Sequence, residues 1–253
     1  SKNSLINANE LKKKHKIENI NFVQKDILTN ITKLGKFDSI LCMGVLHHLS
    51  NPKKGLQILS KMLNTNGMIF LYLYGKLGGH KRMLNKELIS ILLGKQKTDY
   101  DSGIKLVRDI GFNKFDYGWN LKCKNVEEEN SLIVDSLLHV NEKLYDSFDI
   151  NNLFKKSGLY GYAIYGISVG EKGLLLDVDT KTNQKLLISQ TNVSKKLNSK
   201  FALEKYESKK TREKYRILEL FYEPNGYTII GFTKEGYEKI TNNRIKRNFI
   251  KID

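Results

Sequence analysis

The sequence contains little cysteine and no long apolar run. Cys42 and Cys123 are the two cysteines among 253 residues, and their wide separation predicts neither a disulfide framework nor a cysteine zinc site. The longest apolar runs fall far short of the roughly eighteen residues that span a bilayer. The first residues are polar, unlike a signal peptide. We therefore expect no membrane partner, no metal site and a cytoplasmic location.

Acidic residues are scarce relative to basic ones: 27 Asp and Glu stand against 43 Lys and Arg, a net charge of +16. Such a surplus occurs in proteins that bind nucleic acids. However, only 6 of the basic residues are Arg and 37 are Lys, whereas proteins that read phosphates and base edges favour the forked guanidinium. The basic residues are also spread along the chain. The charge therefore leaves a nucleic-acid partner open without favouring one.

The most informative pattern is FDSILCMGVLHHLSNP, at residues 37–52. Residues 40–43 form an apolar run with the length of a buried strand. Gly44 ends the run, at a point where backbone can approach a ligand closely. His47 and His48 follow, and Asn51 with Pro52 is typical of a helix start. In an open α/β sheet, ligands bind at the carboxyl ends of such strands.

This segment resembles the fourth motif of class I S-adenosylmethionine-dependent methyltransferases, in which an aspartate opens the fourth strand and a Gly-Val-Leu-His-His-Leu loop follows. Asp38 and residues 44–49 stand at those positions. Residues 21–27 (NFVQKDI) resemble the family's third strand with its acidic residue, and residues 67–74 (GMIFLYLY) resemble its fifth strand. The resemblance covers residues 4–75. It implies an enzyme with S-adenosylmethionine as cofactor and a Rossmann-like α/β fold, whose sheet is mostly parallel with an antiparallel last strand.

The family's glycine-rich turn is missing from this sequence. No G-x-G-x-G pattern occurs, and Gly75, Gly78 and Gly79 come after the fifth-strand segment. In the family, that turn lets backbone amides approach the cofactor, and an acidic residue at the end of the second strand binds the ribose. The helical pattern from Leu5 to Leu11 fits the helix that follows the second strand. We therefore expect a sheet without its first β-α-β unit, in a chain incomplete for cofactor binding.

We divide the chain into a partial methyltransferase core (residues 1–75), a helical insertion that caps the strand ends (76–147) and a C-terminal part of the core with a further helical insertion (148–253). We expect helices at 4–16, 52–64, 85–93, 102–110, 127–138 and within 193–220, and one that Asp149 caps and Gly158 ends. We expect strands at 20–24, 38–43, 67–74 and 160–167, and a last, antiparallel strand at 227–232. Residues 173–178 compete for that last position, and the basic tail after Thr241 should be frayed.

The resemblance implies a set of cofactor-binding residues. Asp26 and Ile27 match the position that meets the adenine, where the carboxylate accepts from the exocyclic amine and the next amide donates to the ring. The competing interpretation is that Asp26 is the N-cap of a helix that begins at Leu28. The loop that holds the cofactor's amino-acid end is matched by Cys42, Met43 and Gly44, with His47 beside them. Cys42 itself is expected to be a small buried hydrophobe rather than a nucleophile.

Methyl transfer from a sulfonium mainly requires alignment of the nucleophile with the methyl carbon. The candidate catalytic residues are His47, His48, Tyr74 and His139, with His47 or His48 as a possible general base. Neighbouring positions on a turn point about 100° apart, so we expect one of these two histidines to line the pocket and the other to pack. His139 lies in DSLLHVNEKLY, which resembles a segment of one branch of the family that also carries the equivalent of Tyr145.

Two further interpretations concern the acceptor. Lys76, His80 and Arg82 follow the fifth-strand segment, where they could orient an anionic or aromatic substrate or simply form a solvated basic loop. We expect a small-molecule acceptor. The alternatives are an RNA or protein methyltransferase, favoured by the charge, and a non-catalytic methyltransferase-like binding or scaffold protein, favoured by the missing glycine turn.

Overall fold

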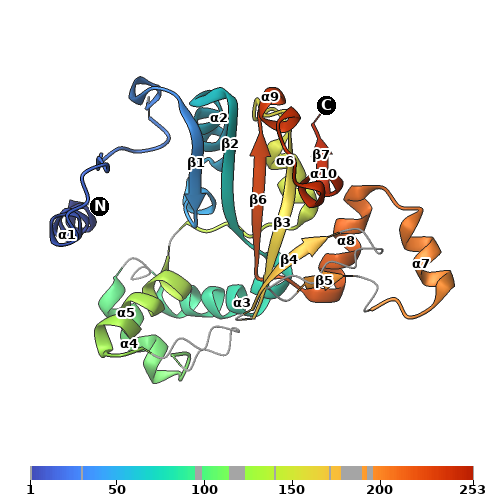
Figure 1. Ribbon diagram of the computed structural model, residues 1–253. Helices are drawn as coiled ribbons and strands as arrows, with labels where there is room; N and C mark the ends of the chain where they lie inside the picture. Colours follow the sequence, from blue (N-terminus) through green and yellow to red (C-terminus); the bar gives the residue numbers. More distant parts are fainter. Residues whose placement is uncertain are drawn as a thin grey trace.

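The computed structural model describes residues 2–29, 31–94, 99–113, 123–139, 141–170, 172–177, 190–192 and 196–252. Within these residues the strands form one sheet in the order β1-β2-β6-β3-β4-β5, with β7 paired to β3 (Figure 1). The strands are β1 (Phe37–Met43), β2 (Leu63–Tyr74), β3 (Gly161–Val169), β4 (Lys172–Asp177), β5 (Gln190–Asn192), β6 (Gly226–Phe232) and β7 (Phe249–Lys251).

The strand directions confirm the Rossmann-like α/β fold. β1 and β2 are parallel, and β6 is antiparallel to both β2 and β3. Strands β1, β2 and β3 therefore run one way, and β6, the strand predicted at 227–232, lies between β2 and β3 and opposes them. The competing segment at 173–178 is also a strand, β4. It turns back from β3 through Gly170 and extends the sheet on the far side of β3.

Residues 20–24 do not form the predicted strand; they run as an exposed, irregular segment. Phe22 and Val23 are exposed, as is Ile20. A strand needs a neighbouring ladder for its N–H and C=O groups, and β1, at the edge of the described sheet, pairs with β2 alone. In the fold that the sequence resembles, the partner of this segment belongs to the β-α-β unit that we do not find in the sequence. The hydrophobic pattern alone could not create the strand.

The helices begin where the chain offers caps. In α2 (Pro52–Lys61), the Asn51 side chain accepts from the Lys54 N–H at 3.0 Å, as predicted. In α6 (Ser147–Phe154), Asp149 is not the cap. Asp146 caps the helix, and the two carboxylates accept from each other's backbone N–H in a capping box. A second Asp three residues earlier thus moves the helix start, and the helix ends before Gly158.

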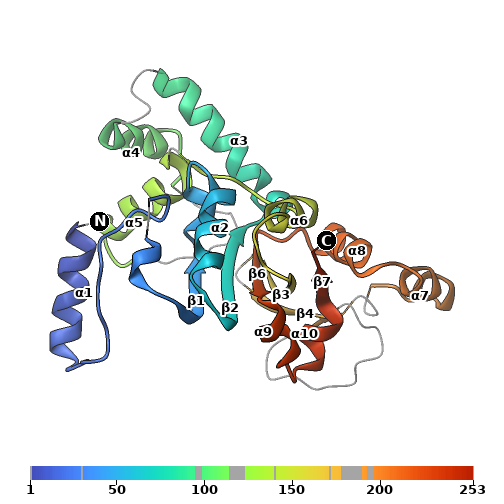
Figure 2. The same ribbon diagram turned by 90° about the horizontal axis from the view of Figure 1, so that it is seen from above.

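The main core lies between the sheet and the helices α2, α6 and α8 (Thr211–Tyr222). Fully buried side chains from sheet and helices meet there, among them Leu56, Leu71, Phe154, Tyr162, Tyr215 and Ile229. α1 (Lys2–Lys14) lies apart from this core in both views (Figures 1 and 2). α7 (Lys200–Glu207) precedes α8, and α9 (Lys234–Glu238) follows β6.

The residues after β2 form a separate helical layer, which we call the cap. It consists of α3 (Lys76–Leu93), α4 (Tyr100–Asp109), α5 (Val126–Ile133) and a π-helical turn (Val134–Leu138). A small core of its own holds it together, made by Ile89, Val107, Ile133, Leu137 and Leu138. In Figure 1 the cap lies below the sheet, at the end where β2 runs into α3. The three-part division of the chain remains a prediction.

The tail after Thr241 is not frayed. It forms α10 (Asn243–Asn248) and then β7. The Asn248 amide donates to the Leu176 carbonyl at 2.9 Å, and Arg247 bonds to the buried Asp177 at 2.8 Å. The pattern of basic residues in the tail did not indicate that Asp177 of β4 would bind it. This carboxylate anchors the tail to the sheet. Along the described parts of the chain, no helix has the length and apolar character needed to cross a bilayer.

Candidate active site

The loop after β1 lies at the carboxyl ends of β1 and β2. Gly44 has a φ of +73°, a left-handed conformation that favours glycine. Its N–H points to the Tyr72 carbonyl of β2 at 3.4 Å. Met43 and Val45 on either side are exposed, and a 3-10 turn from Leu46 to His48 follows. The backbone therefore turns sharply outward at the sheet end where α/β folds bind ligands.

The four predicted catalytic side chains lie together. His47 is 0% exposed, and its ring lies 4.0 Å from the Tyr74 ring and 4.3 Å from the His48 ring, between centroids. The His48 ring is in turn 4.0 Å from that of His139. We call these four residues the histidine cluster. The structure thus joins three separate segments of the sequence into one group.

Backbone hydrogen bonds fix the segment after His139 across this cluster. The Lys143 N–H donates to the His47 carbonyl at 3.0 Å, and the Tyr145 N–H donates to the Tyr74 carbonyl at 2.9 Å. The Nδ1 atom of His48 lies 2.8 Å from the Asn141 carbonyl. Because a carbonyl can only accept, this His48 nitrogen carries a proton, and Nε2 is the acceptor in the neutral ring.

Burial shifts the pKa values of three side chains in the cluster toward the uncharged form. Burial, and then the neighbouring His48, lower the pKa of His47 to about 4. Neither ring nitrogen of His47 makes a hydrogen bond of normal geometry among the described residues, although the Tyr72 backbone lies close. Burial also lowers the pKa of His139 and raises that of Tyr74 to about 12. The expectation that one of the adjacent histidines packs agrees with the full burial of His47.

A buried ion-pair triad lies beside the cluster. The Glu142 side chain is fully buried and accepts from Arg82 through both of its oxygens, with the Nη1–Oε2 bond at 2.9 Å. Lys86 donates to the same Oε2 at 2.7 Å. Burial alone would raise the pKa of Glu142, but the hydrogen bonds and charges of Arg82 and Lys86 outweigh it and hold that pKa below its usual value. Arg82 also lies over the Tyr74 ring, 5.2 Å from its centroid.

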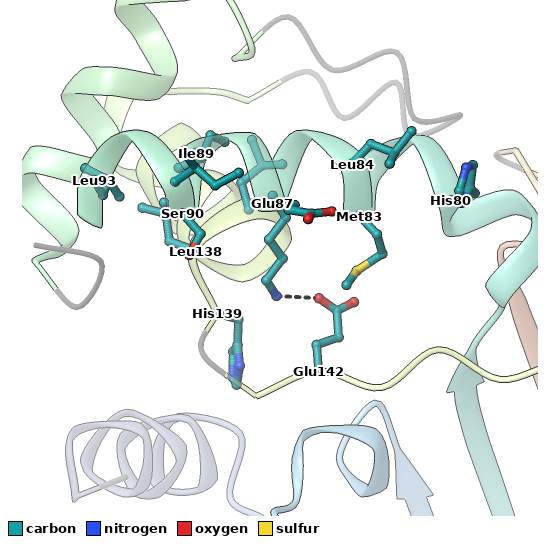
Figure 3. A pocket seen from close by; sticks show the side chains of 13 residues that line it. His80, Met83, Leu84, Glu87, Ile89, Ser90, Leu93, Leu138, His139 and Glu142 are labelled. Atoms are coloured by element: carbon teal, nitrogen blue, oxygen red, sulfur yellow. Dashed lines mark hydrogen bonds and ion pairs between the residues drawn. The ribbon is translucent and has the colours of Figure 1, made fainter. Parts of the chain in front are cut away.

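A cavity of about 560 Å³ lies between α3 and the segment around His139 (Figure 3). Figure 3 shows Glu142 in the middle of it, with Met83 and Leu84 on one side and Leu93 on the other. Lys86, which also lines the cavity, pairs with this carboxylate. His139 both lines this cavity and contacts the His48 ring, with the two ring planes tilted by 35°. The cavity therefore reaches the histidine cluster from the side of the cap.

The sequence did not single out Lys86 or Glu142. Glu142 stands inside the DSLLHVNEKLY segment, but its partners lie about sixty residues earlier on α3, so no local pattern marks the pair. His80 is exposed and lines the cavity, and whether it meets a substrate remains a prediction. Lys76 is the first residue of α3, and its ammonium pairs with the Asp149 carboxylate at 3.7 Å. Tyr145 is buried in the main core.

Of the predicted cofactor residues, Cys42, Met43, Gly44 and His47 lie at the end of β1 and in the loop that follows, whereas Asp26 and Ile27 precede β1 in the chain. Their role remains a prediction. The Asp26 carboxylate accepts from the Leu28 N–H at 2.8 Å, and residues 27 and 28 form a turn rather than the start of a helix that the competing interpretation expects. Ile27 packs against the main core. Cys42 is buried, and burial raises its thiol pKa to about 11, which favours the packed hydrophobe. No group of three His, Cys, Asp or Glu side chains among the described residues is arranged to hold a metal ion.

Comparison with known proteins supports the same family. Residues 1–101 match the model of a methyltransferase domain. An uncharacterised protein of Synechococcus sp. is 28% identical over 148 residues, which cover 56% of this chain and 35% of that protein. A tRNA U34 carboxymethyltransferase of Campylobacter hominis is 53% identical over 36 residues, which cover 14% of this chain and 13% of that enzyme.

Among solved structures, PKMT2 from Rickettsia typhi superposes with a TM-score of 0.59 at 16% sequence identity, over 97% of this chain and 44% of that one. The same protein has also been solved in complex with AdoHcy, and that structure matches with the same TM-score and identity. The chain spans about a third of the Synechococcus relative and less than half of PKMT2. These matches confirm the resemblance to class I S-adenosylmethionine-dependent methyltransferases.

Proposed function

We propose that this chain, whose first 101 residues match a methyltransferase domain, takes part in methyl transfer from S-adenosylmethionine to a small-molecule acceptor. The observation that supports it most directly is the sharp turn at Gly44 beside the histidine cluster, at the shared ends of β1 and β2. The cavity under α3 opens toward the same cluster. A donor site and an acceptor site would thus meet at one end of the sheet.

Residues of the β1 loop fit one part of the cofactor. The outward backbone turn at Gly44 leaves the space beside its Cα open, since an added Cβ would meet no atom within 4 Å. Carbonyls of residues 42–44 would hold the amino-acid end, and Asp26 with Ile27 would meet the adenine. When bound, S-adenosylmethionine supplies a methyl group on a positively charged sulfur. The glycine-rich turn of the family is not in this sequence, so residues 1–253 carry part of the donor site.

The protein's own residues would align the acceptor rather than supply strong acid or base. A neutral His48, with Nδ1 donating to Asn141, can accept the acceptor's proton at Nε2. His139 would hold His48 in place through the contact of their rings. The buried His47 and the half-buried Tyr74, both uncharged near neutral pH, would help to keep the site dry.

The test is AdoHcy affinity, measured by calorimetry in the full product of the reading frame that contains these residues. We expect Asp26→Asn to weaken binding about tenfold, the worth of one hydrogen bond to a charged group. Asp38→Asn is the matched control, since Asp38 lies at the opposite end of β1 and bonds to Asn64. Equal affinities in all three proteins would contradict the adenine role of Asp26. A complete lack of AdoHcy binding would favour the non-catalytic scaffold alternative.

A nucleic-acid acceptor is the second candidate, because a 36-residue stretch is shared with a tRNA U34 carboxymethyltransferase and the net charge is +16. The two candidates differ in a simple assay. Labelled S-adenosylmethionine is incubated with the protein and either bulk tRNA or a small-metabolite extract. Label in tRNA, with an affinity that falls steeply with salt, would replace the small-molecule proposal. Label in the metabolite fraction would support it.

A further inference from the structure

The cavity under α3 is long and mostly apolar. Its upper wall uses side chains three or four positions apart on α3, from His80 through Met83 and Glu87 to Ser90, which share one helix face, and the lining continues to Leu93. Thirteen helical residues rise about 20 Å, so the cavity extends along most of α3. The cap's own core residues Leu137 and Leu138 supply apolar surface opposite. Such a space suits an elongated ligand with an apolar body.

At the polar centre of the cavity, two cations pair with a single carboxylate. Arg82 occupies both oxygens of Glu142 and also donates to the Ser136 carbonyl at 2.9 Å. Lys86 adds a second cation to the same carboxylate. Glu142 is therefore already neutralised without Lys86. Arg82 lies outside the cavity lining, whereas Lys86 belongs to it.

We propose that Lys86 is a ligand-binding residue and that the cavity takes an organic acid, with the apolar body along α3 and the carboxylate on the Lys86 ammonium. A lysine has three N–H donors, so it can bind a ligand carboxylate while it keeps its bond to Glu142. Glu87 lines the exposed rim and is the charge that opposes such a ligand. The identification of this acid as the methyl acceptor rests on the proposed function. Its binding in the cavity does not depend on that function.

The test compares three ligands that share one apolar body: 4-phenylbutyrate, 4-phenylbutanol and 4-phenylbutylamine. Their affinities are measured by NMR titration of the chain without cofactor. We expect the acid to bind about tenfold more tightly than the alcohol, the usual worth of a hydrogen bond to a charged group, and the amine to bind most weakly. An amine that binds as tightly as the acid would overturn the proposal.

Variants locate the charge that is responsible. Lys86→Met should remove the preference for the acid and leave the alcohol affinity unchanged, whereas Lys86→Arg should keep the preference. Glu87→Gln should strengthen acid binding a few-fold, because it removes a repelling charge. Lys81→Met is the matched control: Lys81 is an exposed α3 lysine outside the cavity lining. An unchanged acid affinity in Lys86→Met, in a protein that melts like the parent, would overturn the proposal.

Two failures can be told apart. If phenylbutyrate binds through Lys86 but AdoHcy never binds, the cavity assignment stands and the methyltransferase proposal falls. If AdoHcy binds and the three ligands show no preference, the donor site stands and the acid site is wrong. The two measurements use different ligands and different residues, so neither result depends on the other.

Discussion

The imidazole rings of His48 and His139 lie with centroids 4.0 Å apart and join the β1 loop to the cap. His48 ends the 3-10 turn after β1, and His139 directly follows the π-helical turn that packs on α3. The His48 Nδ1 also bonds to the Asn141 carbonyl at 2.8 Å. The position of the cap over the ends of β1 and β2 therefore depends in part on this pair.

The first prediction concerns the coupling of these two rings. In a double-mutant cycle of His48→Asn and His139→Asn, we expect an interaction free energy of about 0.5–1.5 kcal/mol, as for other ring pairs. Urea unfolding measures it. The control cycle pairs His48→Asn with His80→Asn, because His80 is an exposed residue of α3 that lies apart from His139 in Figure 3. Additive effects in the first cycle would show that the rings touch without stabilising one another.

The second prediction is a loss of stability at acid pH caused by His47. Its pKa is lowered from 6.5 to about 4 by burial and by His48. Between these values the unfolded chain binds a proton that the folded chain does not, so the free energy of unfolding falls as pH drops from 6.5 to about 4. The full difference is about 3 kcal/mol. We expect His47→Asn to flatten this slope in unfolding curves measured at several pH values. A slope identical to that of the parent would contradict the assignment.

The third prediction concerns Glu142. Glu142→Gln leaves Arg82 and Lys86 without their shared carboxylate, and breaking such a buried pair costs about 3–5 kcal/mol. Chemical denaturation should show this loss. Glu87→Gln, the same change at an exposed site on α3, should cost less than about 0.5 kcal/mol.

The same residue gives an acid-stability signature of its own. The Glu142 pKa is below its usual 4.5, so its contribution is complete above pH 4.5 and is lost as the pH falls through the lowered value. The loss therefore comes at lower pH than the one caused by His47. If Glu142→Gln kept the parent's stability, the triad would contribute nothing to the free energy of unfolding, and Glu142 would not hold Lys86 in position in the cavity.

Local signals in the sequence predicted much of the core. Asn51 and Pro52 marked the start of α2, and the apolar runs marked β1, β2 and β6, because capping side chains and strand periodicity act over a few residues. The family resemblance named the four residues of the histidine cluster as candidates. The geometry of the cluster was not predicted, because His48 and His139 lie 91 positions apart in the sequence and meet only when the chain folds.

The wrong predictions share a physical cause. Residues 20–24 have a strand pattern, but a strand depends on a neighbour that the pattern does not contain. The tail was predicted to fray because Arg244 and Arg247 look solvated, whereas the buried Asp177 gives them a partner. Lys86 and Glu142 were missed for the same reason: their pairing is set by packing of the cap on the sheet end and leaves no mark in the nearby sequence.

The fourth prediction tests the turn after β1. Gly44 has a φ of +73°, and a side chain in that conformation costs about 1–2 kcal/mol. The surrounding space is open, so Gly44→Ala should fold with reduced stability rather than clash. Gly173→Ala is the matched control, since its added Cβ also meets no atom within 4 Å and its backbone is in β4 without a positive φ. Equal melting temperatures for the two variants would show that the turn at Gly44 relaxes without cost.

The last prediction concerns the outer edge of the sheet. β1 pairs with β2 alone among the described strands, and its Leu41 side chain is 72% exposed. An apolar edge strand is a template for pairing with another chain, so we expect these 253 residues to self-associate with increasing concentration in sedimentation experiments.

Leu41→Lys should reduce that association, because a lysine on an edge strand opposes pairing while the outward side chain leaves the core intact. Leu220→Lys makes the same change on α8, at a leucine that is 58% exposed and lies away from the sheet edge. Association that falls equally in both variants would point to net charge as the cause. A parent chain that stays monomeric at all concentrations would show that the β1 edge does not pair in solution.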